Sequence, residues 1–320
     1  MCHAHREFGR VVVAAIPMVL VAILLIAGCP QKPQESTPPA QPTTGPGATG
    51  AGPAKAAPPG GATVIQAKGS DTLLQVAQAL AEEYQTQHPE LEMSVTGGGS
   101  GTGFQALIEG TTDIADASRK IKDEETQAAK AKGIEPVEHL VGYDGIAVIV
   151  NKANPLKQIT IEQLSDLFVG QTKDWRALGG TGEVVLVSRD STSGTYEYFR
   201  EHVIQKGDKD SPRDFAASAV MAPSTTQIRD QVAQTKTAIG YIGLGYLDDT
   251  VKAVPIVDKA GKAVLPSIAT VRDGTYPISR PLFMYTKQGV APALQAYLDW
   301  IVGPEGQRIV EQEGFVPLTK

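Results

Sequence analysis

The sequence predicts an α/β fold with mainly parallel sheets. Strand-like apolar runs alternate with segments of helical apolar periodicity from Thr63 to Lys320, which is the pattern of a sheet with crossover helices. Hydrophobic residues make up 42% of the 320 residues and charged residues 20%, a composition that can bury a core. The length is sufficient for about two domains.

The overall charge argues against a nucleic-acid partner. The formal net charge is −6, so the chain lacks the basic excess that neutralises a phosphate backbone. A small anionic ligand is compatible with this charge, because a buried anion site depends on local donors rather than on the charge of the whole protein. The three histidines after residue 62, His88, His139 and His202, lie far apart in the sequence, so we expect no metal and no cofactor.

The N-terminus predicts the compartment. The apolar run Val11–Ala27 follows a weakly basic start and has the form of a signal peptide over residues 1–28. The sequence Ile26-Ala27-Gly28-Cys29 resembles the lipobox of bacterial lipoproteins, which implies that Cys29 is acylated and anchors an extracytoplasmic protein to the bacterial membrane, in the periplasm or at the cell surface. An uncleaved membrane anchor is the alternative, but the run is at the short limit for a span and contains Pro17.

Residues 29–62 predict a tether. The segment Pro30–Ala62 is rich in Pro and Gly and has no apolar periodicity, so it cannot build a core. As a flexible chain it would hold the folded part roughly 30 Å from its lipid.

Two strand-to-helix turns in the first part of the folded region carry polar groups. After the strand-like run Val64–Ala67, Ser70 or Asp71 is predicted to cap a helix, which leaves its first amides and the Thr72 hydroxyl to face a ligand. The second turn, Gly97–Gly103, is rich in glycine, which lets backbone amides approach an oxyanion. Neither a Walker motif nor a dinucleotide fingerprint is present there.

Two further turns complete the set. Ser118 and Arg119 follow a strand, before an acidic helix start at residues 123–125. The segment Arg189–Thr195 follows the apolar run Val184–Val187 and combines a guanidinium, hydroxyls and a glycine at a helix start. Singly, such residues often only cap a helix or face solvent, but four donor-rich helix starts behind four strands favour convergence on one anion.

These motifs resemble those of the phosphate-binding lipoproteins of the ABC phosphate (Pst) transporter. The resemblance also includes Tyr143–Asn151, Ile239–Gly243 and Gly314–Leu318. It implies a two-lobed, periplasmic-binding-protein-like fold of class II, in which each lobe is a mainly parallel sheet with flanking helices and the ligand cleft lies between the lobes. It also implies a monomer that binds inorganic phosphate without altering it and delivers it to the membrane subunits of an ABC transporter.

The resemblance implies lobe boundaries and ligands. One lobe would comprise 63–142 plus 275–320 and the other 143–274, with the chain crossing near 141–144 and returning near 272–276. The ligands carried over are Ser70, Thr72, the amide of Leu73, Ser100, the amide of Gly101, Ser118, Arg189, Ser193, Gly194 and Thr195.

One position departs from the family pattern. Better-known members have an Asp where this chain has Ser118, and that carboxylate accepts the proton of hydrogen phosphate, which sulfate lacks. We expect Asp144 to replace it, with Asp71, Asp116 and Asp190 as other candidates. Arg119 would add a second cation, which would favour a more highly charged oxyanion.

The sequence also allows other functions to be compared with phosphate binding. The same fold could bind sulfate, molybdate or tungstate, or act as a phosphate sensor. A hydrolase is disfavoured because Gly98-Gly99-Ser100-Gly101-Thr102 fails the nucleophile-elbow pattern at its last position. A surface adhesin would not need four anion-ready helix starts.

Overall fold

The structure is a computed structural model that describes residues 63–208 and 210–318. The predicted signal peptide, Cys29 and the tether therefore lie outside the described residues. Within the described residues, no helix is long and apolar enough to cross a membrane.

The first part of the chain alternates strands and helices, as predicted. Its elements are β1 (Thr63–Gly69), α1 (Asp71–Gln87), β2 (Leu91–Thr96), α2 (Ser100–Glu109), β3 (Ile114–Ala117), α3 (Asp123–Ala131) and the long strand β4 (Pro136–Asn151). The apolar residues at helical spacing in α1, Leu73, Val76, Leu80 and Tyr84, are all buried.

The middle of the chain continues the alternation with shorter elements. These are β5 (Ile159–Thr160), α4 (Ile161–Phe168), the 3-10 helix η1 (Trp175–Leu178), β6 (Val185–Arg189), α5 (Gly194–Phe199), the π-helical turn η2 (Arg200–Ile204), β7 (Val220–Ala222), α6 (Thr225–Gln234), β8 (Ala238–Gly243) and the 3-10 helix η3 (Leu244–Tyr246). The last part contains β9 (Val251–Ala253), β10 (Ile256–Val257), β11 (Ala263–Val264), α7 (Ile268–Arg272), β12 (Ser279–Lys287), α8 (Pro292–Val302) and α9 (Pro304–Gln312).

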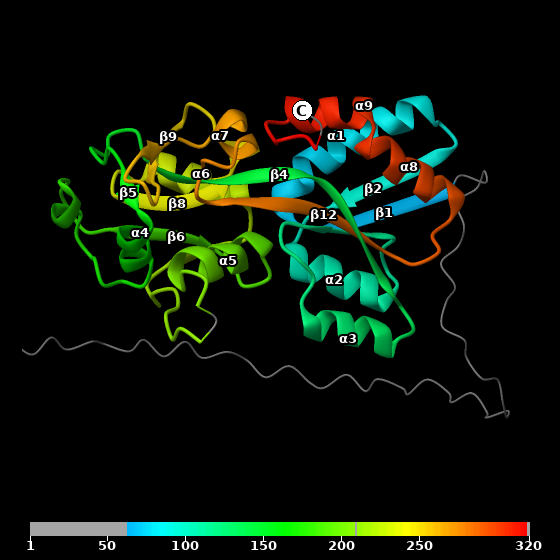
Figure 1. The fold of residues 1–320 in the computed structure, drawn as a ribbon, viewed down its shortest axis with the longest axis horizontal. Helices are drawn as coiled ribbons and strands as arrows, with labels where there is room; N and C mark the ends of the chain where they lie inside the picture. Colours follow the sequence, from blue (N-terminus) through cyan, green and yellow to red (C-terminus); the bar gives the residue numbers. More distant parts are fainter. Residues whose placement is uncertain (1–62, 209, 319–320) are drawn as a thin grey trace, which may run out of the picture. The chain divides into compact units, whose positions relative to one another are not determined.

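Nine strands of the described chain form one sheet. Its order is β2-β1-β3-β12-β4-β8-β6-β7, and β9 pairs with β4. At one end β1 pairs in parallel with β2 and β3, and at the other end β6 pairs in parallel with β7 and β8. The two parallel ends correspond to the two lobes of the α/β fold, and each is covered by helices (Figure 1).

Two antiparallel strands connect the two ends of the sheet. β4 and β12 run side by side (Figure 1), in a register that pairs Ser279 with Gly145 and Lys287 with Pro136 and shifts once, at Leu282/Phe283. The return strand β12 begins at Ser279, after α7 has ended at Arg272 and the Tyr276 amide has donated to the Thr270 carbonyl. β4 and β12 therefore both pass from one lobe to the other beside the polar turns.

Asp116 is a carboxylate buried in the core of the first lobe. It shares a face of β3 with Ile114, which belongs to the apolar cluster that includes Tyr297 of α8. The side chain is 1% exposed, and its Oδ1 has no hydrogen-bond partner among the described residues. Burial raises the pKa of Asp116 to about 7, because the charged form loses its hydration.

The buried carboxylate of Asp116 predicts that the free energy of unfolding decreases as the pH rises. Above pH ~4 the unfolded chain releases a proton that folded Asp116 retains up to about pH 7, so the folded state binds more protons and the free energy of unfolding decreases across this interval. We expect Asp116→Asn to remove on the order of 3 kcal/mol of this decrease. Urea unfolding at pH 4.5 and pH 8 measures it, with the exposed Asp249→Asn as the control. An equal pH dependence in Asp116→Asn and wild type would contradict this account.

Candidate functional site

The four predicted polar turns meet at one place. We call the following five buried side chains the hydroxyl cluster: Ser70, Thr72, Ser100, Ser118 and Thr195. Ser70 Oγ donates to Ser118 Oγ at 2.9 Å, and Ser118 Oγ lies 3.4 Å from Ser100 Oγ. Thr72 and Thr195, which come from opposite ends of the sheet, share a hydrogen bond of 2.8 Å between their hydroxyl oxygens. The carboxyl ends of parallel strands lie at one edge of each half-sheet, which explains why these helix starts converge.

Gly194 allows the turn before α5 to approach the other turns. A Cβ at this position would lie 2.4 Å from Ser100 Oγ and 2.7 Å from Ser118 Oγ. Any other residue would therefore collide with the two hydroxyls. The absence of a side chain at residue 194 therefore lets the start of α5 lie close to the cluster.

Three of the predicted ligands are engaged inside the protein. Ser193 is the N-cap of α5, and its Oγ accepts hydrogen bonds from the amides of Thr195 and Tyr196. The Gly101 amide donates to the Thr192 carbonyl at 3.0 Å, and the Leu73 amide donates to the Ser70 carbonyl at 3.1 Å.

The predicted capping of α1 is wrong in its detail. Ser70 occupies the N-cap position, but its side chain makes no capping hydrogen bond, because the hydroxyl donates to Ser118 instead. The carboxylate of Asp71 accepts the Gly98 amide at 3.1 Å. Asp71 thus fixes the glycine-rich turn rather than its own helix.

Arg280 is the cation of the hydroxyl cluster, and the sequence reasoning missed it. Its Nη2 lies 3.2 Å from Thr72 Oγ1 and 2.9 Å from Thr195 Oγ1, and its Nη1 donates to the Ser118 carbonyl at 3.0 Å. Arg280 is 1% exposed. A signal was present: Arg280 stands directly before the apolar run of β12, and a charged residue that is buried with such a strand requires a partner.

Asp144 is the partner of Arg280. The two residues lie opposite each other on β4 and β12, with Asp144 Oδ2 2.9 Å from Arg280 Nη2 and 3.2 Å from Nε. Asp144 Oδ1 accepts the Leu244 amide at 2.9 Å. Burial raises the pKa of Asp144 and lowers that of Arg280, and in each case the opposite charge of the partner acts against the shift.

The Arg189 guanidinium is hydrogen-bonded to groups other than the hydroxyl cluster. Its Nη2 donates to Asp71 Oδ2 at 2.5 Å and to the Pro223 carbonyl at 3.0 Å, while Nε and Nη1 donate to the Ala222 carbonyl and Thr225 Oγ1. A guanidinium has five N–H donors, so these four bonds leave no pair of donors for a bidentate contact with an oxyanion. Oδ2 of Asp190, the next residue in the chain, is 4.0 Å from Arg189 Nη2.

Arg119 is paired with two carboxylates. Its two terminal nitrogens bind the two oxygens of Glu125 at 2.8 and 2.7 Å, and its Nε lies 2.6 Å from Glu197 Oε2. Lys122 also donates to Glu197. Arg119 therefore connects the β3–α3 turn to α5 and is neutralised there.

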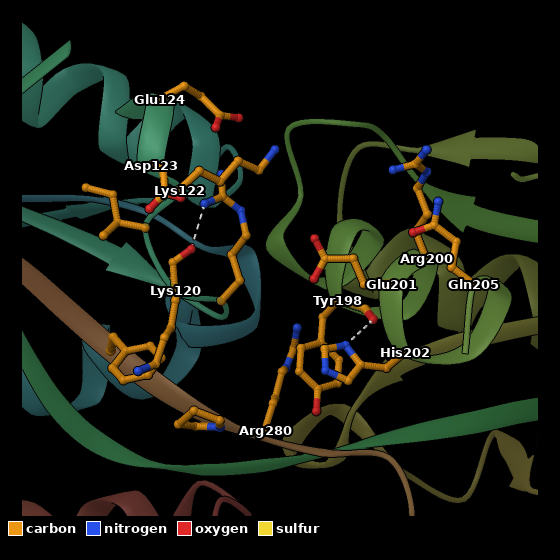
Figure 2. Close-up of a pocket in the computed structure, with 14 residues that line it drawn as sticks. Lys120, Lys122, Asp123, Glu124, Tyr198, Arg200, Glu201, His202, Gln205 and Arg280 are labelled. Carbon is orange, nitrogen blue, oxygen red and sulfur yellow. Dashed lines mark hydrogen bonds between the residues drawn. The ribbon is translucent and has the colours of Figure 1, made fainter. Parts of the chain in front are cut away.

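Arg280, which contacts the hydroxyl cluster, also lines a cavity of about 670 Å³. Figure 2 shows Lys120 and Lys122 on one side of it and Tyr198, Glu201 and His202 on the other, with Arg280 at its base. The guanidinium of Arg280 lies 5.7 Å from the centroid of the Tyr198 ring. The cavity mixes cations with anions, so it is polar without a strong excess of either charge.

The fold and this site define a ligand-binding protein of two lobes, with donor groups from both lobes around one polar centre. The model of the PBP superfamily domain matches residues 47–305. The phosphate-binding protein PstS of Pseudomonas aeruginosa is 34% identical over 273 residues, which cover 79% of this chain and 83% of that protein. PstS of Staphylococcus epidermidis is 33% identical over 263 residues, 79% of this chain and 78% of that protein.

Solved structures of phosphate-binding proteins are also similar to this chain. A candidate phosphate ABC transporter substrate-binding protein of Clostridium perfringens, crystallised with bound phosphate, aligns with a TM-score of 0.72 and 31% identity over 80% of this chain and all of that one. An ABC-type phosphate transport receptor of Vibrio cholerae aligns with a TM-score of 0.64 and 26% identity, over 80% of this chain and 100% of that chain. The chain belongs to the PBP superfamily and, within it, to the family of the PstS phosphate-binding proteins.

The ion pair between Arg280 and Asp144 generates a prediction about stability. Arg280→Met leaves a buried carboxylate without its cation, so we expect the free energy of unfolding to fall by about 3–5 kcal/mol. Urea unfolding of wild type and variant measures the loss. Arg176→Met, which removes an exposed arginine paired with Asp174, should show no detectable change. A loss below about 1 kcal/mol in Arg280→Met would refute the role of this pair.

Proposed function

We propose that this protein captures inorganic phosphate between its two lobes and delivers it to the membrane subunits of an ABC importer. The observation that carries the proposal is the hydroxyl cluster, in which donors from both ends of the sheet surround Gly194 and Arg280. Hydroxyl and amide donors that are fixed before binding suit an oxyanion that has lost its water. The names and the bound phosphate of the relatives support the same ligand.

Binding without chemical change is the second part of the proposal. The hydroxyls of the cluster bond to one another and to Arg280, an arrangement that holds a ligand but lacks the base of a nucleophilic site. The relatives are named as binding proteins. We therefore propose a solute-binding protein and not an enzyme, working without a cofactor and as a monomer.

The contacts of the hydroxyl cluster support a particular ligand set. We propose that phosphate binds to the hydroxyl cluster, the Gly194 amide and Arg280. The ligand roles predicted for Leu73, Gly101, Arg119 and Arg189 would require present hydrogen bonds to rearrange. The Ser193 hydroxyl only accepts hydrogen bonds here, so its proton can still be donated to an anion. All five roles stay predictions. The proton-acceptor role of Asp144 also stays a prediction, and Arg280 would then be shared between Asp144 and the anion.

The test of the proposed function is calorimetry on the full chain in detergent, with phosphate, sulfate and molybdate. We expect phosphate to bind most tightly. Ser118→Ala should weaken phosphate binding by about 10- to 100-fold, because a hydrogen bond to a charged group contributes about 1.5–3 kcal/mol. Ser191→Ala removes an exposed hydroxyl from the loop before α5 and should bind like wild type. Tighter binding of sulfate or molybdate than of phosphate would replace the proposed ligand.

We further propose that the protein is anchored by lipid on Cys29 after removal of residues 1–28, and that residues 29–62 act as the tether. The lobe boundaries proposed are 63–142 plus 275–320 and 143–274, which place the crossings on β4 and before β12. Closure of the lobes about these crossings would enclose the anion.

The anchor can be tested through Cys29→Ala. Two or three acyl chains give durable membrane attachment, whereas a single chain binds only marginally. We expect the variant to lose incorporation of labelled palmitate and to move from the detergent phase to the aqueous phase. Cys2→Ala is the control and should keep both properties. Palmitate incorporation in Cys29→Ala at the level of wild type would rule out the lipobox.

A further inference from the structure

The carboxylate of Asp71 connects three parts of the molecule. Asp71 begins α1 beside the β1–β2–β3 end of the sheet, and its Oδ1 accepts the amide of Gly98 in the glycine-rich turn. Its Oδ2 accepts Arg189 Nη2 at 2.5 Å, and its backbone carbonyl accepts the Tyr246 hydroxyl at 2.6 Å. Arg189 ends β6 and Tyr246 ends η3, at the opposite end of the sheet.

Arg189 is committed to this position by its own lobe. The carbonyls of Ala222 and Pro223 and the hydroxyl of Thr225 accept three of its N–H groups, and the carboxylate of Asp71 accepts a fourth. The Arg189 side chain is 1% exposed and that of Asp71 is 10% exposed. A guanidinium held in this way presents one charged edge to the other lobe, and the acceptor that meets it is Asp71.

The pair depends on the closed arrangement of the two lobes. Neither end of the sheet contains both partners, so separation of the lobes would break the bond and return both charges to water. The stabilisation that the pair supplies is therefore present only in the closed state. A ligand that binds the closed state gains apparent affinity in proportion to the population of that state.

We propose that the ion pair between Arg189 and Asp71 is a latch between the lobes, which increases the affinity for phosphate without touching the anion. The inference rests on the proposed function and deepens it, since it assigns to Arg189 a positioning role in place of the predicted ligand role. Arg280 then supplies the charge at the hydroxyl cluster, and Arg189 favours closure around it.

The substitution that separates the two roles is Asp71→Asn. The amide oxygen of Asn can still accept the Gly98 amide, but the charge that holds Arg189 is lost. If Arg189 is a latch, Asp71→Asn weakens phosphate binding, as Arg189→Met does. If Arg189 is instead a ligand of the anion, removal of the competing carboxylate frees the guanidinium, and phosphate binds as tightly as before or more tightly.

The experiment is calorimetry with inorganic phosphate on the full chain in detergent. It compares wild type, Asp71→Asn, Arg189→Met and the double variant. We expect each single variant to lose about tenfold or more in affinity for phosphate, mainly through faster phosphate release. The double variant should bind phosphate no more weakly than the single variant that has the lower affinity. Arg176→Met is the matched control, because it breaks an exposed ion pair with Asp174 inside one lobe, and it should bind like wild type.

Each outcome decides between the roles. Undiminished phosphate binding by Asp71→Asn, or a double variant with the sum of the two single losses, would overturn the latch. If wild type itself does not bind phosphate, the proposed function fails and the latch fails with it, which is a distinct result from undiminished binding in Asp71→Asn. Thermal unfolding by circular dichroism verifies that each variant is folded. Asp71→Ser, which keeps a small acceptor for the Gly98 amide, is the second variant if Asp71→Asn does not fold, with the same expected loss.

Discussion

The buried ion pair between Arg280 and Asp144 is the interaction on which the organisation of the site depends. The two residues face each other on the strands that connect the lobes, where the chain passes from one half of the sheet to the other. Taking two charges out of water is costly, so such a pair persists only when further hydrogen bonds complete it. Here the Ser118 carbonyl, the two threonine hydroxyls and the Leu244 amide provide those bonds. The requirement to satisfy one buried charge thus fixes turns from both lobes.

The charges around the site are balanced locally. Arg280 is paired with Asp144, Arg189 with Asp71, and Arg119 with Glu125 and Glu197. An anion that enters such a site is stabilised mainly by fixed dipoles, the hydroxyls and the helix-start amides, and only in part by net positive charge. Fixed dipoles need no reorganisation when the ligand arrives, and they let an acidic protein bind an anion.

The sequence predicted the fold and all five residues of the hydroxyl cluster because both depend on local signals. Strand runs, helical periodicity and polar helix starts are properties of neighbouring residues, and they located Ser70, Thr72, Ser100, Ser118 and Thr195 on four turns that do meet. The cation next to the cluster was not found in this way. Arg189 and Arg119 were predicted because they lie beside polar turns, and both are paired with carboxylates in this structure. Arg280 comes from a strand that carries no polar turn.

The sequence by itself determined the alternation of strands and helices, the position of each polar turn and the glycine at residue 194, because short-range sterics and hydrogen bonding specify them. Only the tertiary structure decided which carboxylate each arginine meets. Asp71 and Arg189 are separated by 118 residues and Asp144 and Arg280 by 136, so no spacing along the chain encodes the choice. The partner of a buried charge is set by the register of the connecting strands and by the approach of the two lobes, since each charge must find its counter-ion in the assembled interior.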